Sequence, residues 1–144
     1  MKHPGHIEEL LSRLITGWTK EKSDGLQQEQ REAMIDAMLY CLFADDYDDP
    51  MERHVLDKAI AKFSWESNTD IPEYIESASA IVREALASRE SEQQLLKDIS
   101  RRLTNWETRF QAIQFCKILL YSDLFVSNEE VRALAELSAA FKQH

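Results

Sequence analysis

The stretch MIDAMLYCLFA, residues 34–44, decides the fold of this chain. Asp36 alone interrupts its apolar residues, so a helix formed here is apolar around most of its circumference. A second stretch of the same kind, AIQFCKILLY, occupies residues 112–121. Helices of this type are normally buried at the centre of a bundle. We therefore predict an all-α fold in which two central buried helices are surrounded by amphipathic ones.

Elsewhere the apolar residues show helical spacing rather than the alternation typical of strands. Helix starts are marked where an Asp, Ser or Thr precedes a Glu by three residues, because such a pair can satisfy free backbone N–H groups. The four pairs are Asp49 with Glu52, Asp70 with Glu73, Thr104 with Glu107, and Ser127 with Glu130. These signals predict about seven helices. Their expected ranges are 6–21, 27–45, 50–63, 71–89, 92–103, 105–122 and 128–143.

The composition indicates a globular chain with a strongly acidic balance. Its 144 residues include 26 acidic and 17 basic ones, for a formal net charge of -9. A field of this sign repels phosphate backbones, so we expect no nucleic-acid partner. The longest apolar run, residues 37–44, is far shorter than the roughly 20 residues of a membrane span. We expect a cytoplasmic protein without a transmembrane segment, folded as a single domain over residues 1–144.

The two apolar stretches belong to an internal repeat. Residues 29–63 align with residues 107–141 without a gap, at a constant offset of 78 positions. The identical pairs are Glu29 and Glu107, Arg31 and Arg109, Ile35 and Ile113, Leu42 and Leu120, Asp45 and Asp123, Glu52 and Glu130, Leu56 and Leu134, Ala61 and Ala139, and Phe63 and Phe141. A further match pairs SRLITGW at 12–18 with SRRLTNW at 100–106. We predict three-helix copies at about 6–63 and 94–141, joined by the helix at 71–89.

Both copies carry acidic residues between the central helix and the capped helix that follows it. The segments are ADDYDDPME at 44–52 and SDLFVSNEE at 122–130. Helix capping explains the residues at the cap and three positions later, but it does not explain Asp45 and Asp123. Each of these follows the negative end of a helix dipole, where a carboxylate costs a few tenths to about 1 kcal/mol. An amide donor, a basic neighbour or a cation should offset that cost.

Two interpretations of these acids remain open. One is a Ca²⁺ or Mg²⁺ site, because hard cations favour several converging carboxylates. The candidate metal ligands are Asp45, Asp48, Asp49, Glu52, Asp123 and Glu130. The spacing does not fit an EF-hand, in which Tyr47 would stand at a ligand position and Pro50 at the glycine position. The other interpretation is that the acids only cap helices and form solvated turns.

The motif from Ala44 to Glu52, and its counterpart from Ser122 to Glu130, resembles the repeated motif of the TerB-like proteins of the tellurite-resistance group. That motif reads Ala-Asp-Gly, two residues, Asp or Ser, two residues, Glu. The resemblance covers residues 29–63 and 107–141 and implies a duplicated all-α fold and a function as a cytoplasmic stress or membrane-associated scaffold. It also implies divalent-cation binding through Asp45, Asp49, Glu52, Asp123 and Glu130. Asp46 and Leu124 replace the family's glycine, which weakens the match at the turn.

No catalytic motif supports an enzyme, and the only glycines, Gly5, Gly17 and Gly25, cannot build a phosphate-binding loop. Cys41 and Cys116 are isolated in apolar runs, which predicts reduced core residues. The tryptophans Trp18, Trp65 and Trp106 are expected to anchor the core at helix ends, with an interface contact by one of them as the alternative. The resulting hypothesis is a non-enzymatic TerB-like module that docks a protein partner. The alternative is a structural or homo-oligomerising helical domain whose acids only cap helices.

Thermal unfolding of chelator-stripped protein with Ca²⁺, Mg²⁺, Mn²⁺ and Zn²⁺ separates the two interpretations of the acids. A cation site predicts a saturable stabilisation of about 3 kcal/mol at a hundredfold excess over Kd, lost in Asp45→Asn or Asp123→Asn. Capping alone predicts no shift beyond ionic strength, together with a loss of about 0.5–2 kcal/mol in Asp49→Ala and in Ser127→Ala.

Overall fold

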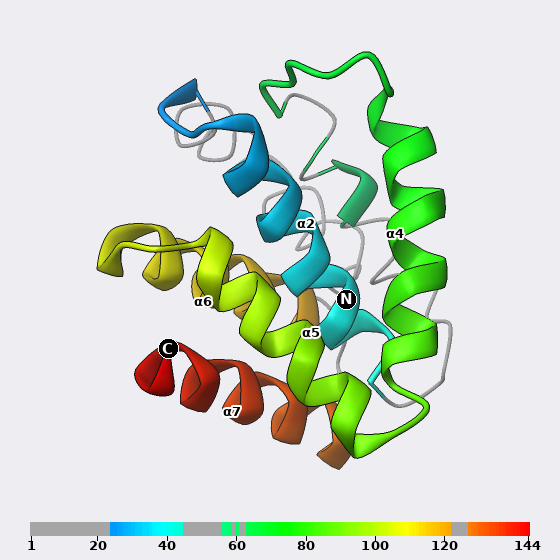
Figure 1. Ribbon diagram of the computed structural model, residues 1–144, viewed down its shortest axis with the longest axis vertical. Coiled ribbons are helices and arrows are strands. Elements are labelled where there is room, and N and C mark those ends of the chain that lie inside the picture. Colours follow the sequence, from blue (N-terminus) through cyan, green and yellow to red (C-terminus); the bar gives the residue numbers. More distant parts are fainter. Residues whose placement is uncertain (1–23, 45–55, 59, 61–62, 122–126) are drawn as a thin grey trace, which may run out of the picture.

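The computed structural model describes residues 24–44, 56–58, 60, 63–121 and 127–144 (Figure 1). These residues form helices and connecting turns, with no strand among them, which confirms the all-α prediction. The helices are α2 (Gln28–Leu42), α4 (Ile71–Ala85), α5 (Arg89–Arg102), α6 (Trp106–Tyr121) and α7 (Asn128–Gln143). The helix predicted at 6–21 lies outside the described residues, and of the one at 50–63 only residues 56–58, 60 and 63 are described. None of the described helices has the length and apolar character that a membrane span requires.

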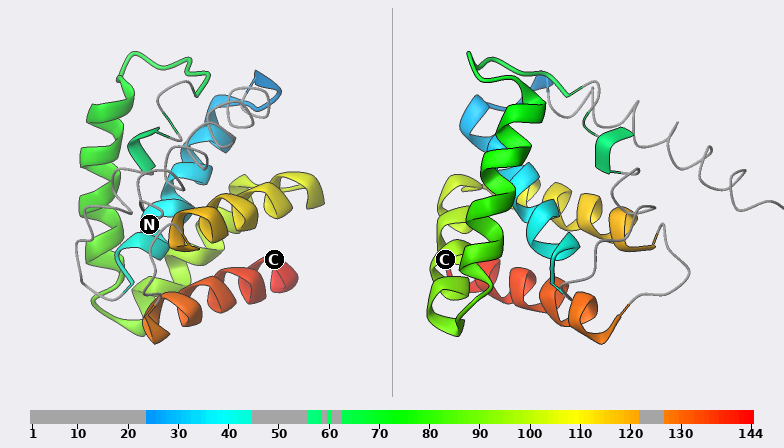
Figure 2. Two further views of the ribbon diagram at one scale, coloured as in Figure 1. Left: turned by 180° about the vertical axis from the view of Figure 1, so that it is seen from behind. Right: turned by 90° about the vertical axis from the view of Figure 1, so that its right-hand side faces the viewer.

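Helix α2 is the centre of the described structure. It packs against α4, α5, α6 and α7, and its residues from Ala33 to Leu42 are buried on every side. Figure 1 shows α4 along one flank of α2, and the view from behind in Figure 2 shows α6 with α7 next to it. Helix α6 is buried on the face turned to α2 but exposed on the opposite face. The prediction of two all-round buried helices is therefore right for α2 and only partly right for α6.

Most predicted helix starts are found where the capping pairs place them. Ser127 Oγ accepts the N–H of Glu130 at 3.1 Å, and Glu130 Oε1 accepts the N–H of Ser127 at 2.9 Å, a complete capping box. Asp70 Oδ1 accepts the N–H of Glu73 at 2.9 Å. The pair Asp49 and Glu52 lies outside the described residues.

Two other helix starts differ from the prediction. The N-terminus of α6 is capped by Asn105 rather than by Thr104, since Asn105 Oδ1 accepts the N–H of Thr108 at 2.8 Å. The helix predicted at 71–89 ends at Ala85, because Ser88 starts the next helix by accepting the N–H of Ser91 at 3.1 Å. Helix α5 therefore begins at Arg89, three positions before the predicted start at 92.

A buried ion pair joins α2 to α5 and, through a tyrosine, to α4. The Asp36 carboxylate accepts hydrogen bonds from Arg102 Nη2 at 2.5 Å and from the Tyr74 hydroxyl at 2.6 Å. Burial raises the pKa of Asp36, and the neighbouring charge of Arg102 opposes that rise. Asp98 Oδ2 lies 2.7 Å from the same Nη2 atom of Arg102. The only acidic residue of the apolar stretch is thus supplied with partners by two surrounding helices.

We predict that Arg102→Ala lowers the free energy of unfolding by about 3–5 kcal/mol, because it leaves the Asp36 carboxylate buried without its counter-ion. The control is Arg101→Ala, whose side chain is 69% exposed in a surface ion pair with Asp98 and should change stability by less than about 1 kcal/mol. Urea denaturation of both variants checks this. Equal effects of the two substitutions would contradict the assigned role of Arg102.

Two phenols, the buried Tyr40 and the half-buried Tyr74, predict a loss of stability at alkaline pH. Burial raises the pKa of Tyr40, helped by its 2.6 Å hydrogen bond to Glu92, and burial with the charge of Asp36 raises the pKa of Tyr74. A raised pKa in the native state means that the contribution is complete below the unfolded pKa of about 10 and is lost as the pH rises above it. The free energy of unfolding should fall by up to about 1.4 kcal/mol per pH unit for each phenol.

The check is a series of urea denaturations between neutral pH and pH 11.5 on the wild type and on the double variant Tyr40→Phe with Tyr74→Phe. The variant loses two hydrogen bonds at every pH, so the comparison is between slopes rather than absolute values. A shallower alkaline slope in the variant is expected. Parallel slopes above pH 10 would show that other groups control the alkaline loss.

Candidate functional site

The predicted cation ligands are mostly beyond what the structure describes. Asp45, Asp48, Asp49, Glu52 and Asp123 lie outside the described residues. Glu130 is described, 2% exposed, with Oε1 committed to the capping box of α7. Among the described residues no group of three or more His, Cys, Asp or Glu side chains could hold a metal ion. The cation site therefore stays a prediction.

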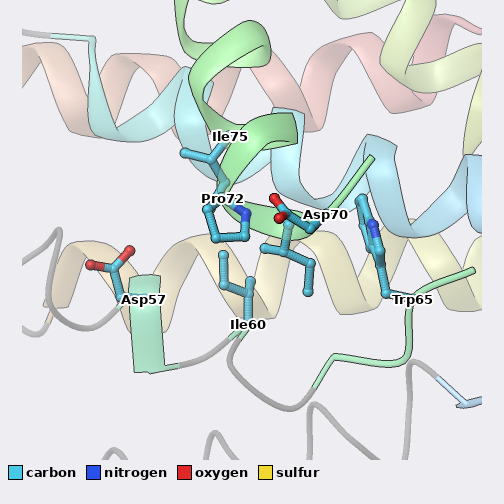
Figure 3. A pocket seen from close by; sticks show the side chains of 7 residues that line it. Asp57, Ile60, Trp65, Asp70, Pro72 and Ile75 are labelled. Atoms are coloured by element: carbon cyan, nitrogen blue, oxygen red, sulfur yellow. The ribbon is translucent and has the colours of Figure 1, made fainter. Parts of the chain in front are cut away.

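A cavity of about 640 Å³ lies between Asp57 and Ile60 on one side and the start of α4 on the other (Figure 3). Its walls are mainly apolar, and Figure 3 shows Ile60 and Pro72 between Asp57 on one side and Trp65 on the other. Asp70 Oδ1 caps α4, and the Trp65 indole N–H donates to the carbonyl of Thr69 at 2.7 Å. These polar groups hold the loop before α4 in place. This arrangement explains a structural role and does not require a ligand.

A second hollow, between α6 and α7, has a different character. It is a groove of about 380 Å³. Its lining residues are Trp106, Arg109, Phe110, Ile113, Gln114 and Lys117 from α6, with Ser138, Phe141 and Lys142 from α7. We call this the α6–α7 groove. Large apolar side chains form its surface and basic ones stand among them, in a chain whose net charge is -9.

Two exposed aromatic rings stand at one end of this groove. Trp106 is 77% exposed and Phe110 is 47% exposed. They lie one helical turn apart, with ring centroids at 5.7 Å and planes tilted by 46°. Scattered exposed apolar residues are normal, but paired aromatic rings beside a groove are typical of interaction sites. The prediction that Trp106 anchors the core is therefore wrong, whereas Trp65 does pack against the core.

The sequence contains a signal for this exposed face of α6. The prediction that α6 is apolar around most of its circumference did not use it. Trp106, Phe110, Ile113 and Lys117 follow each other at intervals of three and four residues, so they share one stripe of α6. The charged Lys117 within that stripe marks it as the solvent-facing one. The buried side of α6 carries Ala112, Cys116 and their neighbours instead.

The floor of the groove is fixed by one arginine. Arg109 donates from Nε to the carbonyl of Leu103, from Nη1 to that of Phe141 and from Nη2 to that of Ser100, at 2.5, 2.7 and 2.8 Å. Its guanidinium also lies over the Phe141 ring, 5.4 Å from the centroid. These bonds tie α6 to the end of α5 and to the C-terminal turn of α7. The groove walls are thereby held in one arrangement before any partner binds, which reduces the ordering cost of binding.

The electrostatics of the groove differ from those of the whole chain. No Asp or Glu is among the lining residues, while Lys117 and Lys142 are exposed at its rim. The charge of Arg109 is directed at backbone carbonyls, so the two lysines carry the field that an approaching group would meet. An apolar surface with a basic rim is suited to a ligand that is apolar on one side and acidic at its edges.

The two cysteines and Trp18 were also singled out from the sequence. Cys41 and Cys116 are buried free thiols, as predicted, and Trp18 lies outside the described residues.

No family model, curated protein or solved structure matches the chain. Its function must therefore be argued from the geometry of the groove and from the sequence itself.

Proposed function

We propose that this chain is a non-enzymatic, cytoplasmic, TerB-like helical module that docks a protein partner, and that the α6–α7 groove is its docking site. The observation that carries the proposal is the exposure of Trp106 and Phe110 beside a groove whose floor Arg109 fixes. Tryptophan and arginine are enriched among the residues that dominate binding energy at protein interfaces. Aromatic rings supply a large contact area with few rotatable bonds.

Burial of the two exposed rings would supply part of the free energy that docking requires. An aromatic side chain can bury roughly 150–250 Å², so covering the exposed parts of Trp106 and Phe110 removes about 250–300 Å² from water. At about 25 cal/mol per Å² this corresponds to about 6–7 kcal/mol before the cost of association. A micromolar complex needs about 8 kcal/mol net. The two rings would be the main anchors, and further contacts along the groove would supply the rest.

Cation binding is a second element of the proposal and rests on a separate observation. Helices α2 and α6 end at Leu42 and Tyr121, so Asp45 and Asp123 follow the C-terminal ends of both helices in sequence. A carboxylate beside the negative end of a helix dipole is destabilising, so a compensating group is expected near each aspartate, and Ca²⁺ or Mg²⁺ is one candidate. The docking groove does not depend on it, because none of its lining residues belongs to the acidic segments.

The docking proposal is tested with the variant Trp106→Ser and the control Val131→Ser, which removes a 54% exposed apolar side chain of α7 outside the groove lining. Proteins recovered by both the wild type and the control are purified, and their Kd values for the wild type, the control and Trp106→Ser are measured directly. We expect Trp106→Ser to weaken binding at least about tenfold, a loss of about 1.4 kcal/mol. Unchanged thermal unfolding of both variants confirms that they are folded.

Two outcomes contradict this assignment. If every recovered protein binds Trp106→Ser as tightly as the wild type, the groove is not the docking site. If the wild type is a dimer and Trp106→Ser is a monomer in sedimentation experiments, the groove joins copies of the chain. The structural, homo-oligomerising alternative would then be correct.

A further inference from the structure

The α6–α7 groove has a counterpart in the first copy of the predicted repeat. Subtracting 78 from five of its nine lining residues places Ile113 on Ile35, Gln114 on Asp36, Lys117 on Leu39, Ser138 on Ile60 and Phe141 on Phe63. These five counterparts are all buried, with exposures from 0% to 7%. The same helical positions are thus covered in one copy and line an open groove in the other.

Helix α4 covers part of the counterpart surface, while Phe115 of α6 packs on Phe63 and Arg102 of α5 binds Asp36. Tyr74 of α4 donates its hydroxyl proton to Asp36, at 2.6 Å, and Ile71 and Ile75 line one cavity together with Ile60. Figure 2 shows α4 running along this side of the molecule next to α2, and Asp57 and Ile60 line a cavity together with the start of α4. The first-copy groove therefore has a known type of occupant, an amphipathic helix.

The character of α4 shows what kind of helix such a groove accepts. Its buried face consists of small and branched residues one or two turns apart, namely Ile75, Ala78, Ser79, Val82 and Ala85. Its exposed face carries Glu73, Glu76 and Glu84. This is the helix-in-groove arrangement, in which apolar anchors three, four and seven residues apart enter a groove formed by other helices.

In the second copy no described helix takes the place of α4. Trp106 and Phe110 stand at the positions of Gln28 and Glu32, which adds apolar surface, and Lys117 stands where Leu39 is buried. Acidic residues on the outer edges of an incoming helix would lie close to Lys117 and Lys142 at the groove rim. Charge complementarity of this kind favours an acidic helix over a basic one.

We infer that the α6–α7 groove binds an amphipathic, acidic helix of a partner protein, with the carboxylates of that helix at its edges beside the groove rim. This inference rests on the proposed docking function and specifies the partner's chemistry. Apolar residues of the helix pack on Trp106, Phe110 and Phe141, and its carboxylates face the two lysines.

The probe is a fluorescently labelled peptide of residues 70–86, DIPEYIESASAIVREAL, which is an acidic amphipathic helix of the required type. Its anisotropy is followed as the full chain is added. We expect saturable binding that weakens at least about tenfold in Trp106→Ser and in Phe110→Ser, and that is unchanged in Val131→Ser. If the peptide binds more weakly to the two groove variants but not to Val131→Ser, it binds at this groove and not at the α4 position.

The charge requirement is tested with a second peptide in which Glu73, Glu76 and Glu84 are replaced by Lys. We expect it to bind the wild type more weakly than the acidic peptide, and the preference to reverse in the variant Lys117→Glu with Lys142→Glu. Equal binding of the two peptides to the wild type would overturn the assignment of an acidic helix.

Three further results would overturn the inference. One is the absence of saturable binding, and another is binding that Trp106→Ser does not affect. The third is self-association of the chain that depends on Trp106, because the groove would then bind a second copy of the chain. If a purified partner requires Trp106 but the acidic peptide does not bind, the docking function stands and only the inferred partner chemistry fails. If binding of neither the partner nor the peptide depends on Trp106, the docking function and the inferred partner chemistry both fail.

Discussion

The described structure depends on the burial of one carboxylate at the centre of α2. Asp36 stands in an otherwise apolar stretch that is buried on every side, so its charge cannot be left without partners. Arg102 of α5 and Tyr74 of α4 supply them, at 2.5 and 2.6 Å. Because a buried ion pair tolerates little displacement, this contact fixes how α4 and α5 are placed along α2. An apolar residue in place of Asp36 would allow the two helices more freedom to slide.

A second polar cluster extends the same constraint toward α7. The Tyr40 hydroxyl donates to Glu92 at 2.6 Å, and Arg89 connects that carboxylate to Glu136 of α7. Arg109 then ties α7 to α6 and to the end of α5. The walls of the α6–α7 groove are thus connected to the core by side-chain bonds as well as by packing. This connection explains how a surface groove can hold a defined shape between two helices that meet at the edge of the bundle.

Local sequence signals predicted those parts of the structure that local chemistry controls. The capping box of Ser127 and Glu130 located α7 at its observed bounds, and Asp70 located the start of α4. Asn105 caps α6 in place of the predicted Thr104, because both residue types can cap a helix and only the structure shows which side chain reaches a free backbone N–H. The exposure of Trp106 could not be read from its type, because a tryptophan at a helix end serves equally well as a core anchor or an interface residue. The groove itself joins α6 to α7, and no pattern within either helix contains it.

The comparison between the two copies suggests how one helical position can serve two purposes. In the first copy Gln28 donates to Glu32 at 3.1 Å and accepts the N–H of Glu66 at 2.8 Å, so this turn of α2 holds the chain before α4. In the second copy Trp106 and Phe110 take those positions and have no such segment to hold among the described residues. Polar side chains are suited to a permanent contact with nearby backbone, whereas paired aromatic rings are suited to a contact that forms and dissolves with a partner. The divergence at these two positions is what the predicted repeat requires if one copy is covered by its own chain and the other is kept for binding.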